Sequence, residues 1–467
     1  MLATATGSLL QLDNAAARQA GWARRPGSTI AAQPMPPELR LAGLQHAAIS
    51  LERGQAAAAA TAGTSPEEIS HLYDSRAQVA TFLSEEFEAF VERAGSGGGP
   101  DEARARGGAL EQAERAVALW KEAGRVLLDA AVAPEVASAV PEDWEAAAWE
   151  AEPDVDLLCA LASACLRHGR LLIQWTEEVG GPSHKAGETA VERALQLYSE
   201  ACSRCDSAKG DAADDVLRDW AQALWDAAAL AVPAGGKAGR AGAGEARVSS
   251  SVAAARALLI RAASKAADSV GLLAVPLASS CNLLGDTLSA AADLERDEIG
   301  RAADAAGAAD AAAAALSFYQ RSVREGYERA LRISSRDLQA QIGAADARLS
   351  IARLHRQREG AEAVLDGGAG HGPLSTALAL YDALLRQPVA EWLKQSRQVN
   401  EYVEARYNAC CALALASTPT GGRVAECSEL LAAMMADGDT TVEEVAFDED
   451  FAHLRECEWL RRALGRE

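Results

Sequence analysis

Positive charge, aromatic residues and long apolar runs are all scarce in this 467-residue chain. The sequence holds 45 basic against 67 acidic residues, a formal net charge of −22, and only 5% aromatic residues. Such an excess of negative charge excludes a protein whose main role is to coat nucleic acid or an anionic membrane. No uncharged apolar run reaches the roughly 18 residues of a spanning helix, so we expect no membrane insertion.

Paired cysteines are also scarce. Nine cysteines are an odd number, in a chain too long to need disulfide bonds. Cys202 and Cys205 form a single Cys-x2-Cys motif, but a structural zinc needs a second pair of ligands and no further Cys-x2-Cys or His-x3-His follows. With Cys165, they lie in strongly helical stretches, and we interpret them as small core residues. We therefore predict neither metal nor cofactor.

The first 65 residues differ in composition from the rest. They hold three acidic residues and five arginines, and the segment from Arg24 to Pro37 is rich in Pro and Gly. An acid-poor segment with Arg, Ser and Ala is typical of a solvated tail, and an organellar transit peptide is the alternative. The predicted location is therefore cytoplasmic, or a plastid or mitochondrion if a transit peptide is present. We expect one helical turn near Pro37 to Arg53.

From about Ser65 onward the sequence predicts helices almost throughout. Apolar and small residues recur at three- and four-residue steps, and the good helix formers Ala, Leu, Arg and Glu dominate. Strand-like alternation never lasts more than a few residues. The chain is predicted to be all-α. Gly- and Pro-rich breaks fall at Ala94–Pro100, Gly180–Gly187, Pro233–Gly244, Gly367–Pro373 and Thr418–Gly422.

One recurring motif places a bulky residue between two smaller ones. Steps of four and three residues put all three side chains on one helix face, so a partner helix can approach closely around the bulky one. The copies are Ala116-x3-Trp120-x2-Ala123, Ala194-x3-Tyr198-x2-Ala201, Ala255-x3-Leu259-x2-Ala262, Val323-x3-Tyr327-x2-Ala330, Ala377-x3-Tyr381-x2-Leu384 and Cys427-x3-Leu431-x2-Met434.

A second motif lies between these copies. Its pattern is apolar-x2-apolar-small-x2, usually followed by a further apolar residue. The small residue of this pattern is termed the anchor. The small anchor lets the two helices of a hairpin touch. The anchors are Ala162, Ala221, Gly285, Ala345 and Cys410.

The two motifs together resemble the tetratricopeptide repeat, with W-x2-L-G-x2-Y in its first helix and A-x3-F in its second. The closing segment Phe447–Arg455, followed by Trp459 and Leu460, is similar to the end of many such arrays. The resemblance covers about residues 110–465. It implies a right-handed α-solenoid, a superhelix of stacked antiparallel helix hairpins that serves in protein–protein interaction.

The repeat length departs from that family. Successive anchors are 59 to 65 residues apart, against about 34 in the tetratricopeptide repeat. We therefore predict enlarged hairpins, with inserts at Glu177–Gly187, Val232–Ala246, Ala292–Ala312 and Arg358–Pro373. The predicted regions are a tail at 1–65, N-terminal helices at 66–150, repeats at 151–440 and a capping helix at 441–467.

Candidates for catalysis are few. Asp214-Asp215-x3-Asp219 invites comparison with the acidic magnesium clusters of all-α isoprenoid enzymes, but such a site needs a second acidic cluster and basic partners. A helix N-terminus explains the Asp pair without a ligand. The glycine-rich stretch 367–372 follows no strand, so it is not a dinucleotide loop. We expect no enzyme activity.

Binding is therefore expected on the concave face, which the first helix of each hairpin forms in such arrays. Side chains one step off the packing stripe should line this face. They are Arg218, Gln222, Trp225, Asn282, Asp286, Gln339, Asp346, Glu404 and Tyr407. The set is polar and holds more acidic than basic residues, which favours a basic peptide or protein partner. For each residue, a position on a solvated helix face is the alternative.

Three hypotheses of function follow. The leading one is a non-catalytic scaffold or adaptor that binds a protein partner. The second is a fixed structural subunit of a large organellar or ciliary assembly. The remote third is the all-α magnesium-dependent enzyme.

Overall fold

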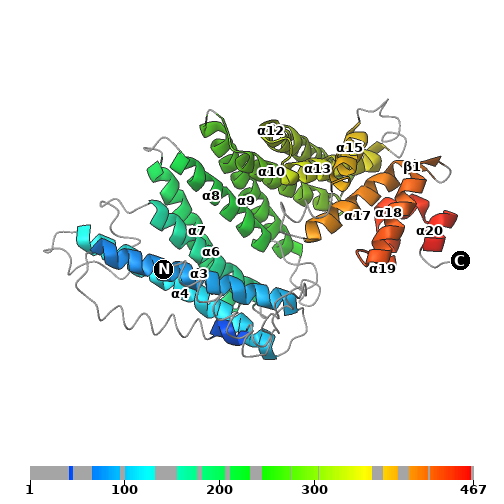
Figure 1. The fold of residues 1–467 in the computed structure, drawn as a ribbon. Coiled ribbons are helices and arrows are strands. Elements are labelled where there is room, and N and C mark those ends of the chain that lie inside the picture. The colour runs from blue at the N-terminus through cyan, green and yellow to red at the C-terminus, as the bar shows by residue number, and fades with distance from the viewer. Residues whose placement is uncertain are drawn as a thin grey trace, which may run out of the picture. The chain divides into compact units, whose positions relative to one another are not determined.

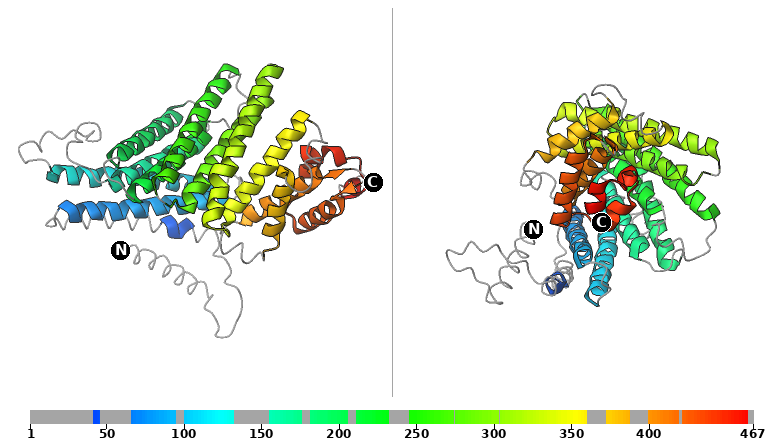
Figure 2. Two further views of the ribbon diagram at one scale, coloured as in Figure 1. Left: turned by 90° about the horizontal axis from the view of Figure 1, so that it is seen from above. Right: turned by 90° about the vertical axis from the view of Figure 1, so that its right-hand side faces the viewer.

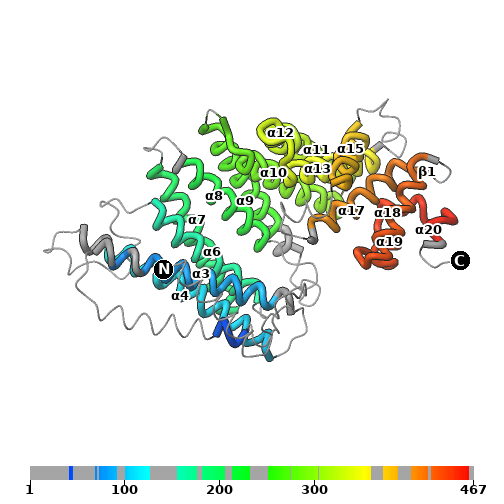
Figure 3. Tube along the Cα trace, in the orientation of Figure 1, coloured from blue at the N-terminus to red at the C-terminus, as the bar shows by residue number. Residues whose placement is uncertain are grey.

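The fold is helical in nearly every segment that this computed structural model describes (Figure 1). The described residues are 41–45, 66–94, 100–131, 155–175, 181–205, 211–231, 245–273, 275–302, 304–359, 372–387, 399–418 and 421–463. The chain divides into two compact units, Met1–Leu230 and Ala231–Glu467. This boundary falls inside the range 151–440 that the sequence predicts as one repeat region. Figure 3 follows the same path as a Cα trace.

The described part of the first unit contains the helical turn at 41–45, two helix hairpins and one further long helix. Its helices are α3 (Pro66–Ala94), α4 (Pro100–Ala131), α6 (Val155–Trp175), α7 (Pro182–Cys205) and α8 (Asp211–Ala231). Helices α3 and α4 pack as one pair, α6 and α7 as another, and α4 also packs on α6. Proline is the first residue of three of these helices, where its fixed φ and missing N–H are tolerated. The closest approach lies between α6 and α7, where a Cβ on Gly169 would stand 2.7 Å from the Gly187 carbonyl oxygen.

The second unit continues the pairing of successive helices. Its first helices are α9 (Glu245–Leu272), α10 (Ala278–Ile299), α11 (Ala305–Arg321), the π-helical turn η3 (Ser322–Tyr327), α12 (Glu328–Ile333) and α13 (Leu338–Glu359). Then come α15 (Pro373–Leu385), α17 (Val399–Leu415), α18 (Val424–Asp437), α19 (Val442–Phe447), the 3-10 helix η4 (Glu449–Leu454) and α20 (Glu458–Ala463). Helix α10 packs on α9 and α11, α13 on α15, and α17 on both α15 and α18. A two-residue antiparallel pair, β1 (Ser417–Thr418) with β2 (Gly421–Gly422), closes the turn before α18.

The predicted packing stripes are confirmed. Every bulky residue of the first motif is buried, and the small residues beside each are buried as well. The anchors of the second motif are also buried. The bulky residues are Trp120, Tyr198, Leu259, Tyr327, Tyr381 and Leu431. Within each unit, the predicted all-α fold of stacked helix hairpins is therefore confirmed, and the left view in Figure 2 shows successive helices of each unit lying side by side.

The tightest seam of the second unit surrounds the ring of Tyr327. This residue ends the π-helical turn η3, and its ring lies between Gly285 of α10 and Gly343 of α13. A Cβ on Gly285 would stand 2.6 Å from the ring atom Cε1, and one on Gly343 would be closer still. Only glycine leaves room for the ring at both positions.

Several expectations about the connections need correction. Ala292–Ala312 is not an insert, because α10 runs to Ile299 and α11 begins at Ala305. The extra length of this hairpin lies in its helices. The region 441–467 is not a single capping helix. It forms α19, η4 and α20, since Asp448 has an extended backbone and its side chain accepts a hydrogen bond from the Asp450 N–H at the start of η4.

The predicted N-terminal turn is present at residues 41–45. It is solvated on one face only, because Leu41 and Leu44 are buried in the core of the first unit. The rest of the predicted tail lies outside the described residues. None of the described helices is both long and apolar enough to cross a lipid bilayer.

Replacing Gly285 by alanine tests the Tyr327 seam. Because the added methyl group would overlap the ring, we expect Gly285→Ala to lower the free energy of unfolding by about 1–3 kcal/mol. The matched control is Gly271→Ala in α9, whose added methyl meets open space. That control should be neutral or stabilising by up to about 1 kcal/mol, since alanine favours a helix over glycine. Urea unfolding followed by circular dichroism measures both, and equal effects would contradict the seam.

Candidate functional site

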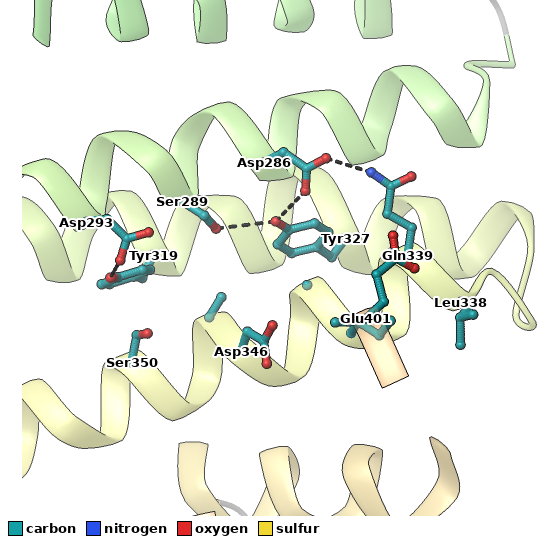
Figure 4. Close-up of a pocket in the computed structure, with 13 residues that line it drawn as sticks. Asp286, Ser289, Asp293, Tyr319, Tyr327, Leu338, Gln339, Asp346, Ser350 and Glu401 are labelled. Carbon is teal, nitrogen blue, oxygen red and sulfur yellow. Dashed lines mark hydrogen bonds between the residues drawn. The ribbon is translucent and has the colours of Figure 1, made fainter. Parts of the chain in front are cut away.

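A cavity of about 450 Å³ lies between α10 and α13, beside the Tyr327 seam (Figure 4). It contains four carboxylates, from Asp286 and Asp293 of α10, Asp346 of α13 and Glu401 of α17. Among the described residues that line it, none is Lys or Arg. The remaining lining residues are Ser289, Tyr319, Tyr327, Leu338, Gln339, Ile342, Gly343, Ala347 and Ser350. The cavity is thus acidic, with hydroxyl groups and an apolar patch.

Asp286 is held at the Tyr327 seam by two neutral donors. The Tyr327 hydroxyl donates to Oδ1 of Asp286 at 2.7 Å, and Nε2 of Gln339 donates to Oδ2 at 2.8 Å. Ser289 Oγ lies 3.4 Å from the same hydroxyl. Burial raises the pKa of Asp286 to about 6, although both hydrogen bonds act to lower it. Desolvation therefore outweighs the hydrogen bonds.

Asp346 has the same environment one hairpin later. It accepts hydrogen bonds from the Tyr381 hydroxyl and from Nδ2 of Asn408, the latter at 3.0 Å. Burial raises its pKa to about 6, against the lowering effect of these bonds and of the nearby Arg353. Asp293 differs, because Arg296 pairs with it at 3.1 Å and the Tyr319 hydroxyl donates to it.

These tyrosine contacts follow from the repeat. In each case a tyrosine of the first motif reaches the residue directly after the anchor of the second motif. The pairs are Tyr198 with Ser163, Tyr327 with Asp286, and Tyr381 with Asp346. Where the bulky residue is Leu259 and has no hydroxyl, the corresponding Gln222 donates instead to Asp226 on its own helix, at 2.9 Å. The polar wall of the cavity is therefore built by the same register that packs the helices.

A second cavity, of about 590 Å³, lies on the other side of the same network. It is lined by Val403, Glu404, Tyr407, Asn408, Asp439, Thr440, Glu444 and Asp448. Asn408 connects the two cavities, because it lines the second and bonds Asp346 of the first. The Tyr407 hydroxyl donates to Oδ2 of Asp448 at 2.9 Å, and Arg406 pairs with Asp439.

Five of the nine residues predicted from the sequence line these two cavities. Asp286, Gln339 and Asp346 lie in the first, and Glu404 and Tyr407 in the second. All of them come from α10, α13 or α17, the helices predicted to form the binding face.

Asn282 does not lie on that face, contrary to its expected position. Its side chain is buried, with 3% of the residue exposed, and Nδ2 donates to Oδ1 of Asp337 at 3.1 Å. The same oxygen accepts from the backbone N–H of Ala340 at 2.9 Å, in the first turn of α13. Asn282 thus fixes the beginning of the neighbouring helix.

Arg218, Gln222 and Trp225 line neither cavity, because they lie on α8 in the first unit. Arg218 pairs with Asp215 at 2.5 Å and approaches Asp214 at 3.7 Å. Arg218 therefore lies beside both members of the Asp214–Asp215 pair, which is compared above with a magnesium site.

Sequence reasoning missed the polar residues that continue the first cavity wall. Ser289 and Asp293 follow Asp286 at steps of three and four residues, and Ser350 follows Asp346 at a step of four. A polar stripe at helical spacing beside the packing stripe was the available signal.

The acidic and thiol groups of Cys411, Asp448 and Asp450 lie within 4.8 Å of one another. Their protein contacts account for this cluster. Arg353 pairs with Asp450, and the Tyr407 hydroxyl donates to Asp448. Burial also raises the pKa of the Cys411 thiol, which favours the protonated form over the thiolate that a metal needs.

No protein-family model and no curated protein matches the chain. A solved structure, a circular tandem repeat protein with novel repeat topology and enhanced subunit contact surfaces, is similar at 15% identity. The similarity covers 98% of this chain and 82% of that one, with a TM-score of 0.33. The recurrence of the packing motifs and the pairing of successive helices identify this chain as a helical repeat protein.

The raised pKa values of Asp286 and Asp346 predict a pH effect on stability. Their folded pKa of about 6 exceeds the ordinary value of 3.8, so between these values the folded state binds more protons than the unfolded state. Their contribution to stability is therefore greatest below about pH 4 and declines as the pH rises through about 6.

We expect the double variant Asp286→Asn/Asp346→Asn to lose part of this decline, because the neutral amides do not ionise. The urea midpoint at about pH 4.5 and about pH 7 measures the effect. Asp310→Asn, an exposed position on α11 outside both cavities, is the matched control and should retain the wild-type decline. An unchanged decline in the double variant would contradict the burial of the two carboxylates.

Proposed function

We propose that this chain is a non-catalytic binding scaffold whose second unit, Ala231–Glu467, holds a basic segment of a protein partner. The observation that carries the proposal is the first cavity, in which Asp286 and Asp346 are enclosed carboxylates and none of the described lining residues is a cation. The recurrence of motifs that resemble the tetratricopeptide repeat supports it, since first helices form the binding face in that family.

A comparison between the repeats supports a role for the negative charge. Ser163 occupies the position of Asp286 and Asp346 beside the Tyr198 hydroxyl, and it carries no charge. Packing alone therefore does not require a carboxylate there. Burial disfavours the ionised forms of Asp286 and Asp346, so ionisation of these two residues near neutral pH lowers the stability of the folded state. A bound cation would favour the ionised forms and so reverse that effect.

A lysine or arginine side chain matches the lining of the first cavity. Its methylene stem can pack on the apolar patch of Leu338, Ile342 and Ala347, while its charged group meets Asp286 and Asp346. The second cavity adds Glu404 and Asp448 on the far side of Asn408. An extended segment with more than one basic residue would use both cavities.

A fixed structural subunit is the second candidate, favoured by an apolar surface at the connection between α9 and α10. Leu272, Val275 and Leu277 are exposed there, Val275 at 73%. Exposed apolar residues gathered in one place are typical of a permanent contact.

A positional-scanning library of fluorescent peptides tests the scaffold proposal. We expect selection of Lys or Arg, and binding of the selected peptide that weakens between about 50 mM and about 300 mM salt. Asp286→Asn/Asp346→Asn should weaken this binding roughly tenfold or more, equivalent to about 1.4 kcal/mol. Fluorescence anisotropy gives the dissociation constants.

The control removes two charges from exposed positions elsewhere in the same unit, as Asp310→Asn/Glu429→Gln. Binding within about twofold of wild type is expected there, because long-range charge is screened by salt. Selection of apolar or acidic peptides, or an equal loss in the control, would refute the proposal. Complete insensitivity to salt would favour the fixed subunit.

A further inference from the structure

In the first unit the apolar faces of α3, α4 and α6 meet in a cluster, termed the groove, that also contains residues 41–45. The helical turn at 41–45 inserts Leu41 and Leu44, which are 3% and 4% exposed, into a cluster of apolar side chains. The turn lies beside α3 and α4 in both orientations (Figures 1 and 2). The other buried members of the cluster are Leu83, Phe87, Phe90, Val91, Ala105, Ala109, Ala113 and Leu171, from α3, α4 and α6.

The walls of this groove are fixed by contacts in which the turn has no part. Ser84 Oγ donates to the Ala109 carbonyl oxygen at 3.0 Å, and Ser70 Oγ to that of Ala123 at 3.3 Å, so two buried hydroxyl groups connect α3 with α4. A Cβ on Gly108 would stand 2.9 Å from the Phe87 ring, which shows how closely these helices meet.

Ion pairs connect α3 with α6 on the same unit. Arg167 pairs with Glu85 at 2.7 Å and with Glu88 at 2.9 Å, and Arg170 pairs with Glu88 at 2.7 Å. The three helices that form the groove are thus held together by their own contacts. The turn contributes two leucines on one face, while Ala42 and Gln45 on its other face are exposed.

We propose that the α3/α4/α6 groove is a docking site for a Leu-x2-Leu helical turn, and that residues 41–45 of this chain occupy it as a detachable intramolecular ligand. Twenty residues separate Gln45 from Pro66 in the sequence. Joining a ligand covalently to its site makes binding intramolecular, and the resulting effective concentration can keep a weak ligand bound. The proposal is independent of the acidic cavities, which lie in the second unit.

If residues 41–45 are such a ligand, the position at which a presequence is cleaved decides whether the groove stays filled. Cleavage before Leu41 would leave the groove filled, whereas cleavage between Gln45 and Pro66 would remove both leucines and expose the apolar surface. In the second case the groove would become available to a partner with the same Leu-x2-Leu face.

The test uses the full chain with Leu41→Glu/Leu44→Glu and a fluorescent peptide of residues 37–53. We expect the variant to keep its helical circular dichroism and to bind the peptide at least about tenfold more tightly than wild type, in which the tethered turn competes. Ala42→Glu/Gln45→Glu adds the same charges on the exposed face and should bind the peptide no better than wild type. A peptide carrying both Leu→Glu changes should not bind the vacated groove.

Three results would overturn the proposal: loss of helicity in the leucine variant, equal peptide affinity in variant and wild type, or no peptide binding at all. The first would mean that the turn is an integral part of the core. As a second measurement, a protease site placed between Gln45 and Pro66 of the full chain allows the connection to be cut. The released fragment should then exchange with labelled peptide on dilution, and failure to exchange would also overturn the proposal.

Discussion

The close approach of helices around the Tyr327 ring determines most of what the second unit can do. Gly285 and Gly343 leave space for the ring, and the ring in turn sets the spacing of α10 and α13. A buried hydroxyl group needs a hydrogen-bond partner, so the residue after the glycine has to be an acceptor. Because that acceptor is Asp286, the packing contact brings a carboxylate into a poorly solvated position, where burial raises its pKa.

At the position after the anchor, the repeats show which kind of residue packing requires and which kinds it permits. Packing places a polar residue after the anchor in the three repeats whose bulky residue is tyrosine, and in the first unit that residue is the uncharged Ser163. It permits an aspartate, which Asp286 and Asp346 supply at a cost in desolvation. At this position the two units therefore differ in charge, while the motif that packs the helices is the same.

The sequence predicts which helix faces pack together far better than it predicts how deeply a polar side chain is buried or how long a helix is. The stripes around Tyr198, Tyr327 and Tyr381 follow from helical periodicity, because a bulky residue among small ones has only one face to bury. Ala292–Ala312 misled the prediction because its alanines favour a helix without any apolar periodicity to reveal one. Asn282 and Asp286 look equivalent in the sequence. Their different burial depends on the neighbouring Asp337, which no local pattern reveals.

The groove of the first unit uses the same principle with a different source for the bulky residue. In both units a contact between helices is completed by large side chains, Tyr327 between two glycines in one case and Leu41 with Leu44 in a cluster of larger apolar residues in the other. Tyr327 belongs to the continuous segment from α11 to α12, so it cannot leave its seam unless that hairpin unfolds. The two leucines stand on a separate turn, and their departure would break none of the hydrogen bonds and ion pairs described above for α3, α4 and α6. Continuity of the chain therefore decides which seam is permanent and which can exchange its occupant.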